Sequence, residues 1–274
     1  MTDFEQDRLR REAEFHDRWA EEIDPDHALV DESFTSVTAM ENDYILRVFG
    51  DVRGKRLLDY GSGASEAGVF FAKQGATVVA VDVSDGMLAA ARKLADHHGV
   101  KLETRQVTGS RIPADDREFD LVYGNGVLHH VDLKQAVPEL ARVMRPEAHG
   151  AFVEPLSYNP AIEVYRHLAK TVRTPDEHPL SFASISAFEP YFREIEHREF
   201  WLLSLSVFAK FFFLDRVHPS KERYWKKVYT DAPRIERWFK HLRSADEVLL
   251  RRLPPLRYLC WNTVIHVSQP VQAR

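Results

Sequence analysis

The chain has 274 residues, enough for one large domain or two small ones, and this length excludes a peptide-sized fold. Its 37 basic and 42 acidic side chains give a formal net charge of −5, so the sequence predicts no nucleic-acid partner. The single cysteine excludes an internal disulfide, and the charged first residues lack the apolar stretch of a secretory leader, which predicts a cytoplasmic protein.

Two sequence patterns follow each other along the chain. Residues 1–50 are predicted to be helical, with Phe15 and Trp19 recurring on one helix face. From Lys55, short apolar runs alternate with helical stretches, a pattern typical of a parallel sheet with helices on both faces. The predicted strands are RLLDYG, TVVAVD, KLETRQV, FDLVYG, GAFVEP and two later segments at about 192–202 and 259–267, which a mostly helical stretch separates.

A glycine-rich motif follows the first predicted strand. It reads D-x-G-x-G-x-S, with Asp59, Gly61, Gly63 and Ser65 in order, and a predicted helix comes next. Glycines let the backbone turn tightly and approach a ligand, while a helix N-terminus directs amide groups into the same crevice. Asp82, at the end of the next predicted strand, is placed to accept hydrogen bonds from ribose hydroxyls. The spacing predicts a nucleoside-type cofactor site rather than a turn without a ligand.

The same motif departs from the dinucleotide fingerprint. Its third glycine would fall at Glu66, whose carboxylate would be repelled by a pyrophosphate. None of the nine tyrosines stands four residues before a lysine, the pair that short-chain dehydrogenases need. NAD is therefore disfavoured as the cofactor.

Further motifs accompany the glycine loop: Asp82 is followed by Ser84 and Met87, and the segments FDLV, GVLHHV and LARVMRP come later. As a set they resemble the class I S-adenosylmethionine-dependent methyltransferases, of the branch that includes quinone C-methylases and natural-product methyltransferases. The resemblance is strong over about residues 50–157. It implies an α/β, Rossmann-like seven-stranded sheet of order 3-2-1-4-5-7-6 with strand 7 antiparallel, N-terminal helices, and a helical insertion between strands 6 and 7.

The resemblance also divides the chain and locates a cofactor site. We expect an N-terminal helical cap (1–50), a cofactor-binding core (51–157) and a substrate-side region (158–274), all in one domain. The family's usual acid after the third strand is missing, and Thr108 can replace only one hydrogen bond to the adenine. Glu147 and Ala148 stand where the family has Gly-Gly, which leaves the turn before the fifth strand open. The residues expected to bind S-adenosylmethionine are Asp59, Gly61, Ser62, Gly63, Asp82, Val83, Met87, Thr108, Gly109, Asn125, Gly126 and Val127.

Three residues are candidates for catalysis. His129 and His130 follow the fourth predicted strand, where the resembling family places the methyl group, and an imidazole suits proton removal at neutral pH. Neighbours on a helical turn point about 100° apart, so one of the two is expected to face the substrate, with a slight preference for His130. Glu154, at the end of the fifth strand, is expected to assist the histidine. Helix capping by the histidines and a solvated Glu154 stay open, and no histidine or cysteine spacing predicts a metal.

The apolar segment 201–214 admits three interpretations: core, the wall of a lipophilic substrate pocket, or a membrane-surface contact next to a basic rim. That rim comprises Arg216, Lys221, Arg223, Lys226 and Lys227. The residues expected to wall the acceptor pocket are Phe15, Trp19, Trp201 and Phe208.

We therefore predict a small-molecule methyltransferase of secondary metabolism that acts on an apolar or aromatic acceptor, with O-methylation favoured. Alternatives are C- or N-methylation of a lipid or quinone-like substrate, and a non-catalytic lipid-surface or partner-binding module. Monomer and homodimer both stay open.

Overall fold

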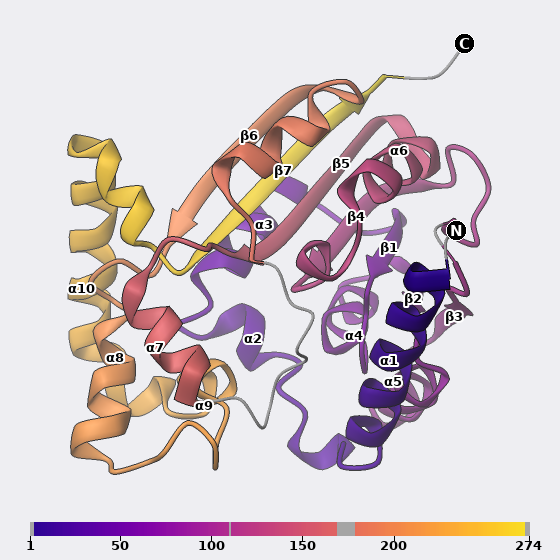
Figure 1. Cartoon of the computed structure of the whole chain (residues 1–274). Coiled ribbons are helices and arrows are strands. Elements are labelled where there is room, and N and C mark those ends of the chain that lie inside the picture. The colour runs from indigo at the N-terminus through magenta and orange to yellow at the C-terminus, as the bar shows by residue number, and fades with distance from the viewer. Residues whose placement is uncertain (1–2, 110, 169–178, 272–274) are drawn as a thin grey trace.

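The computed structural model describes residues 3–109, 111–168 and 179–271. Seven strands in these ranges form one sheet in the order β3-β2-β1-β4-β5-β7-β6 (Figure 1). β7 runs antiparallel to both β5 and β6, and the other pairs are parallel. The predicted fold class and strand order are confirmed. The strands are β1 (Arg56–Tyr60), β2 (Thr77–Asp82), β3 (Leu102–Gln106), β4 (Phe119–Asn125), β5 (Met144–Pro155), β6 (Phe192–Phe200) and β7 (Asn262–Pro270).

Helices cover both faces of the sheet (Figure 1). Within the described ranges, three α-helices precede β1, three connect the parallel strands, and three of those after β5 lie between β6 and β7. They are α1 (Asp3–Ala20), α2 (Glu32–Thr35), α3 (Met40–Phe49), α4 (Glu66–Lys73), α5 (Asp85–His97), α6 (Leu133–Val143), α7 (Pro160–Leu168), α8 (Ser206–Ala209), α9 (Tyr224–Thr230) and α10 (Ala232–Arg252).

Successive strand residues enter two different cores. On β1, Leu57 packs in a core that includes Phe71 of α4 and Leu94 of α5. Its neighbour Leu58 packs in the core on the opposite face, which includes Val137 of α6. Because side chains alternate between the two faces of a strand, a continuous apolar run such as RLLDY buries residues on both sides. This is why the central strands β1, β2 and β4 are mainly apolar rather than alternating, whereas the edge strand β3 is polar.

The connection into β5 differs from a glycine turn. β5 begins at Met144, directly after α6, and its pairing with β4 shifts register between the pairs Phe119–Met144 and Leu121–His149. The segment with Glu147 and Ala148 is therefore an irregular part of the strand, which removes the need for the family's Gly-Gly at this point.

The segment 201–214 is buried in part. Trp201, Val207, Phe208 and Phe211 are buried, whereas Phe213, in the short π-helix η5 (Lys210–Leu214), is 71% exposed. The structure thus confirms the core interpretation for the buried members. Among the described residues no helix is long and apolar enough to cross a membrane.

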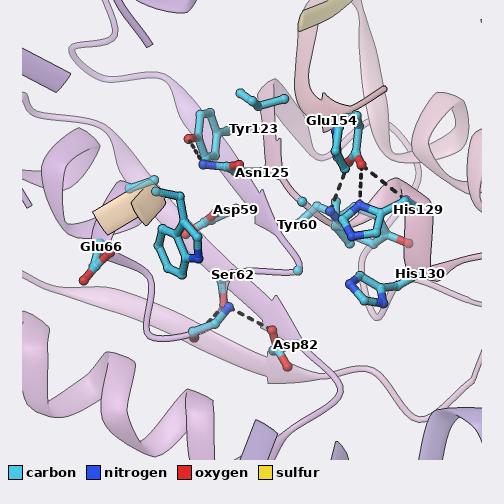
Figure 2. Close-up of a pocket in the computed structure, with 18 of the residues that line it drawn as sticks. Asp59, Tyr60, Ser62, Glu66, Asp82, Tyr123, Asn125, His129, His130 and Glu154 are labelled. Atoms are coloured by element: carbon cyan, nitrogen blue, oxygen red, sulfur yellow. Dashed lines mark hydrogen bonds and ion pairs between the residues drawn. The ribbon is translucent and has the colours of Figure 1, made fainter. Parts of the chain in front are cut away.

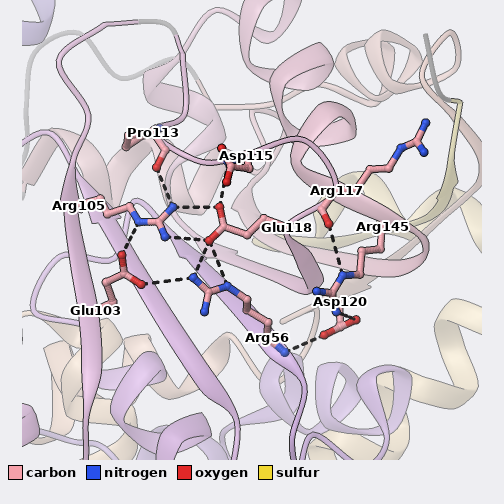
Figure 3. A network of polar contacts seen from close by, with 9 residues as sticks. All are labelled: Arg56, Glu103, Arg105, Pro113, Asp115, Arg117, Glu118, Asp120 and Arg145. Carbon is pink, nitrogen blue, oxygen red and sulfur yellow. Dashed lines mark hydrogen bonds and ion pairs between the residues drawn. The ribbon is translucent and has the colours of Figure 1, made fainter. Parts of the chain in front are cut away.

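An ion-pair network links β1, β3 and the segment that leads into β4 (Figure 3). Glu118 Oε1 lies 2.6 Å from Arg56 Nη2 and 2.8 Å from Arg105 Nη2. Hydrogen bonding by Arg105 is the largest cause that lowers the pKa of Glu118, to about 2. The network ties strands that are distant in sequence to one another without using residues of the glycine loop.

Candidate active site

A cavity of about 550 Å³ opens at the carboxyl ends of the central parallel strands, bounded by α1, the glycine loop, the β4–α6 loop and the α7–α9 region. Such ends are the usual ligand sites of open α/β sheets. The volume lies in the range of pockets that hold small ligands, about 300–1,000 Å³. Of the predicted cofactor and catalytic residues, those lining the cavity are Asp59, Gly61, Ser62, Gly63, Asp82, Val83, Met87, Gly109, Asn125, Gly126, Val127, His129, His130 and Glu154.

Asp59 stabilises the glycine loop through hydrogen bonds to Ser65 and Gly68. Its Oδ2 accepts hydrogen bonds from Ser65 Oγ at 2.6 Å and from the Gly68 amide at 3.1 Å. Ser65 adopts a left-handed conformation with φ of 56°, which turns the chain into α4. Burial is the largest influence on Asp59 and raises its pKa to about 7. Asp59 therefore shapes the loop through its own protein partners.

This raised pKa predicts a pH-dependent stability. Asp59 releases its proton near pH 7 when folded but near pH 3.8 when unfolded, so the stability it contributes below pH 3.8 is lost as pH rises to about 7. Asp59→Asn keeps an oxygen for Ser65 and removes this titration. We expect the free energy of unfolding of Asp59→Asn, relative to wild type, to increase by about 1 kcal/mol or more between pH 4 and pH 7. Urea denaturation of the cofactor-free protein at each pH measures this free energy, and the exposed Asp85→Asn is the control. If the free energy of unfolding depended on pH in the same way for Asp59→Asn and wild type, the assignment to Asp59 would be contradicted.

Asp82 joins the glycine loop to the start of α5. Its Oδ2 accepts from the Gly63 amide at 2.8 Å (Figure 2), and its Oδ1 accepts from the Ser84 amide at 2.9 Å. Burial is the main cause that raises the pKa of Asp82. A carboxylate offers about four acceptor positions, so acceptor capacity remains for a ligand in the cavity. α1 also packs here, because Asp17 Oδ1 accepts hydrogen bonds from Ser84 Oγ at 2.5 Å and the Gly86 amide at 3.0 Å.

Glu154 and His129 form a buried pair on the other side of the cavity (Figure 2). Glu154 Oε2 lies 2.7 Å from His129 Nδ1 and also accepts from the His129 amide at 3.3 Å. Its Oε1 accepts from the amides of Val127 at 3.0 Å and Leu128 at 2.7 Å. Glu154 is fully buried, so the interpretation of a solvated strand-end carboxylate is wrong. It fixes the short 3-10 turn η2 (Leu128–His130) that carries both histidines.

His130 lies on the side of α1 rather than against Glu154. Its Nδ1 is 3.4 Å from Glu12 Oε1. Burial, the largest influence, lowers the pKa of His130 even though Glu12 acts in the opposite direction. The histidine beside Glu154 is therefore His129, whereas the sequence slightly favoured His130. The reason is that residues 127–129 direct their backbone amides at Glu154, which brings the His129 ring against it.

Three of the four predicted acceptor-side aromatics line the cavity: Phe15, Trp19 and Trp201. Phe208 does not, because it is buried behind the wall, with ring centroids 6.3 Å from Trp201 and 4.9 Å from Trp261. Thr108 is also outside the lining. It is exposed, while its neighbours Val107 and Gly109 line the cavity, because β3 ends at Gln106 and the chain turns there.

The structure adds lining residues that the sequence did not predict. Tyr123 Oη donates to Asn42 Oδ1 at 3.0 Å and receives Asn125 Nδ2 at 3.3 Å, so α3 and β4 build one polar wall. Arg223 and Lys226 line the cavity as well, although their spacing suggested only an outer basic rim. The sequence could not predict that these two residues line the cavity, because the residues they contact there belong to α1 and α4, far away along the chain.

The residues present fit S-adenosylmethionine. A Cβ added at Gly63 would meet no atom within 4 Å, so open space lies against the loop backbone where a ligand can approach. Asp82 can still accept hydrogen bonds beside that space, and Val83 and Met87 supply an apolar surface for the adenine ring. No group of three or more potential metal ligands occurs among the described residues.

Comparisons with known proteins agree with this geometry. A family model described as "Methyltransferase domain" matches residues 58–152. A ubiquinone biosynthesis O-methyltransferase of Alkalilimnicola ehrlichii is 32% identical over 126 residues, 45% of this chain and 51% of the relative. A demethylmenaquinone methyltransferase of Clavibacter sepedonicus is 33% identical over 118 residues, 40% of this chain and 47% of the relative. The chain thus spans about half the length of these curated relatives.

Solved structures match over a longer stretch at low identity and show the fold. A geranyl diphosphate C-methyltransferase of Streptomyces coelicolor superposes with a TM-score of 0.56 and 12% identity, covering 84% of this chain and 79% of that chain. The YcgJ protein of Bacillus subtilis superposes with a TM-score of 0.52 and 17% identity, covering 84% and 99%. The sheet order and the glycine loop with its acid agree with the matched family model, so residues 58–152 of the chain are similar to the methyltransferase domain, and the likenesses to solved structures show the fold.

Proposed function

We propose that the chain transfers a methyl group from S-adenosylmethionine to a small apolar or aromatic acceptor, and that the acceptor atom is an oxygen. The observation that carries this proposal is the buried His129–Glu154 pair, which lines the same cavity as the glycine loop and Asp82. A base is needed when a hydroxyl is the nucleophile, because its proton must leave as the methyl group arrives.

The cofactor would be held by residues at the carboxyl ends of β1, β2 and β4. Gly63 leaves the loop backbone open, Asp82 would accept hydrogen bonds from the ribose hydroxyls, and Met87 would pack against the adenine. When bound, S-adenosylmethionine supplies a methyl group on a sulfonium that carries its own leaving group. The protein therefore has to position the acceptor, exclude water and receive a proton, and positioning alone can contribute about 7–11 kcal/mol.

The geometry suits the tautomer that a base requires. A carboxylate only accepts hydrogen bonds, so a neutral His129 would carry its proton on Nδ1, which lies 2.7 Å from Glu154 Oε2. Nε2 is then left with its lone pair, and the acceptor hydroxyl would pass its proton to that atom. Glu154 already accepts four hydrogen bonds from residues 127–129, which uses its acceptor capacity. Glu154 is thus a positioning residue in this proposal.

The relatives support a phenolic or quinone-like acceptor without deciding the atom. One is named an O-methyltransferase of ubiquinone biosynthesis, and another a demethylmenaquinone methyltransferase. A cavity wall that includes Phe15, Trp19 and Trp201 suits an aromatic body. Methylation of carbon is the second candidate, and it would need the same cavity.

Cofactor binding tests the first half of the proposal. We expect Asp82→Ala to weaken S-adenosylhomocysteine binding by about 10- to 150-fold, the loss of one charge-assisted hydrogen bond of about 1.5–3 kcal/mol. Isothermal titration calorimetry measures this, with NADH as a ligand that should not bind. Asp85→Ala is a matched control, because it removes the same charge from an exposed side chain next to the site and should leave binding unchanged. Equal affinities for Asp82→Ala and wild type would overturn the assignment of Asp82.

A further inference from the structure

The cations that line the described part of the cavity gather at one end. All three, Arg166, Arg223 and Lys226, come from α7 and the start of α9, which lie side by side (Figure 1). The contact between these helices is aromatic, with the rings of Tyr165 and Tyr224 centred 5.4 Å apart. Acids also line the cavity, and Glu66 is the one that pairs with a cation of this end; the others are Glu12, Glu41, Asp59, Asp82, Asp132 and Glu154. The cavity therefore has a basic end that the cofactor residues do not use.

Two of the three cations have an acidic partner. Lys226 Nζ lies 3.5 Å from Glu66 Oε1, and Arg166 pairs with Glu163 one helical turn away. Glu66 is the residue that replaces the third glycine of the dinucleotide fingerprint, and its pairing with Lys226 gives it a structural role. Each of these two pairs is neutral as a whole and leaves no surplus charge.

Arg223 carries the surplus positive charge. Its guanidinium carbon lies 3.8 Å from the ring centroid of Trp19, at the end of α1, and no acidic side chain of the described residues forms an ion pair or hydrogen bond with it. Burial lowers the pKa of Arg223 although the charge of Glu22 acts in the opposite direction, the effect expected for a partly desolvated cation without an anion in contact. Stacking on an indole face fixes the plane of the guanidinium and leaves its N–H groups available in that plane.

The surroundings of Arg223 suit a ligand with an aromatic or apolar body. Trp19 and Trp225 meet edge to face with ring centroids 6.3 Å apart, and Phe15, one turn before Trp19 on α1, also lines the cavity. We propose that the methyl acceptor carries an oxyanion, a carboxylate or a phosphate, which Arg223 binds at the α7–α9 end of the cavity while the acceptor body lies along Trp19. This inference rests on the proposed function, and it names the class of acceptor.

The recognition is specific to one anionic group. Arginine presents paired N–H donors that match the two oxygens of a carboxylate or phosphate. Of the three cations that line this end among the described residues, Arg223 alone has no ion pair, so a single oxyanion matches it. A neutral acceptor of the same shape would leave Arg223 without a counter-ion inside the cavity, so the neutral acceptor should bind less tightly than the anionic one.

Binding of matched probes tests the inference. The protein saturated with S-adenosylhomocysteine is titrated by calorimetry with 2-naphthoate, 2-naphthyl phosphate and the neutral 2-naphthamide. We expect at least one anionic probe to bind about 10-fold or more tightly than the amide. Arg223→Met keeps a long stem against Trp19 and removes the charge, and it should abolish this preference while changing amide binding less than about twofold. The stronger of the two anionic probes identifies the oxyanion.

Controls separate this inference from the proposed function. Lys221→Met removes the same charge from an exposed side chain two residues earlier and should keep the preference, and Arg223→Lys should keep part of it even if Arg223→Met folds poorly. The inference is overturned if both anions bind no better than the amide, if none of the probes binds, or if Arg223→Lys and Arg223→Met leave the preference intact. Failure of wild type to bind S-adenosylhomocysteine would instead overturn the proposed function.

Discussion

Replacing His129 by alanine is expected to reduce the rate constant for methyl transfer by about 10²- to 10⁴-fold, the contribution of a positioned general base. The affinity for S-adenosylhomocysteine should change little, because His129, the proposed base, is held by Glu154 rather than by the residues that would bind the ribose. The rate is measured as S-adenosylhomocysteine release with the phenol or catechol that wild type methylates fastest.

His130→Ala is the matched control. Its side chain lies towards Glu12 of α1, so its loss should lower the rate far less than the loss of His129. Glu154→Gln places amide hydrogens against the backbone amides of residues 127 and 128 or against His129, so it should lower both the rate and the stability. Wild-type rates for His129→Ala would show that positioning alone drives the reaction, and a larger loss in His130→Ala would exchange the roles of the two histidines.

Gly61→Ala should destabilise the folded protein by about 2–5 kcal/mol. Gly61 has φ of +64°, and an added Cβ would lie 2.4 Å from Val127 Cγ2 and 2.7 Å from Val127 Cβ. A left-handed backbone costs a residue with a Cβ about 1–2 kcal/mol, and overpacking costs about 1–3 kcal/mol more. The glycine loop and the β4–α6 loop would have to separate, so cofactor affinity should fall as well.

Gly63→Ala isolates the backbone cost from the cost of overpacking. Gly63 has a similar φ of +51°, but its added Cβ would meet no atom within 4 Å, so only the backbone cost of about 1–2 kcal/mol applies. Urea denaturation of both variants without cofactor gives the comparison. Equal losses of stability in the two variants would mean that the contact with Val127 does not constrain position 61.

The sequence pattern by itself determined a parallel sheet with helices on both faces and the placement of the glycine loop, whereas the strand order followed from the family resemblance. Strand and helix periods are local properties, and the order of apolar runs and helices leaves few topologies for a parallel sheet. Gly61, Gly63 and Asp82 lie at strand ends that meet because the strands are parallel neighbours. Their positions along the chain were therefore sufficient to predict that they share one site.

Only the tertiary structure decided which side chains meet across the cavity. Glu154 selects His129 over His130 because three successive backbone amides turn towards it, and the sequence of the turn does not reveal that direction. Phe208 packs behind Trp201, and Arg223 stacks on Trp19 from a helix far along the chain. The physical reason is that such contacts depend on how helices pack over the sheet edge, and side chains distant in sequence carry no periodic signal of their eventual neighbours.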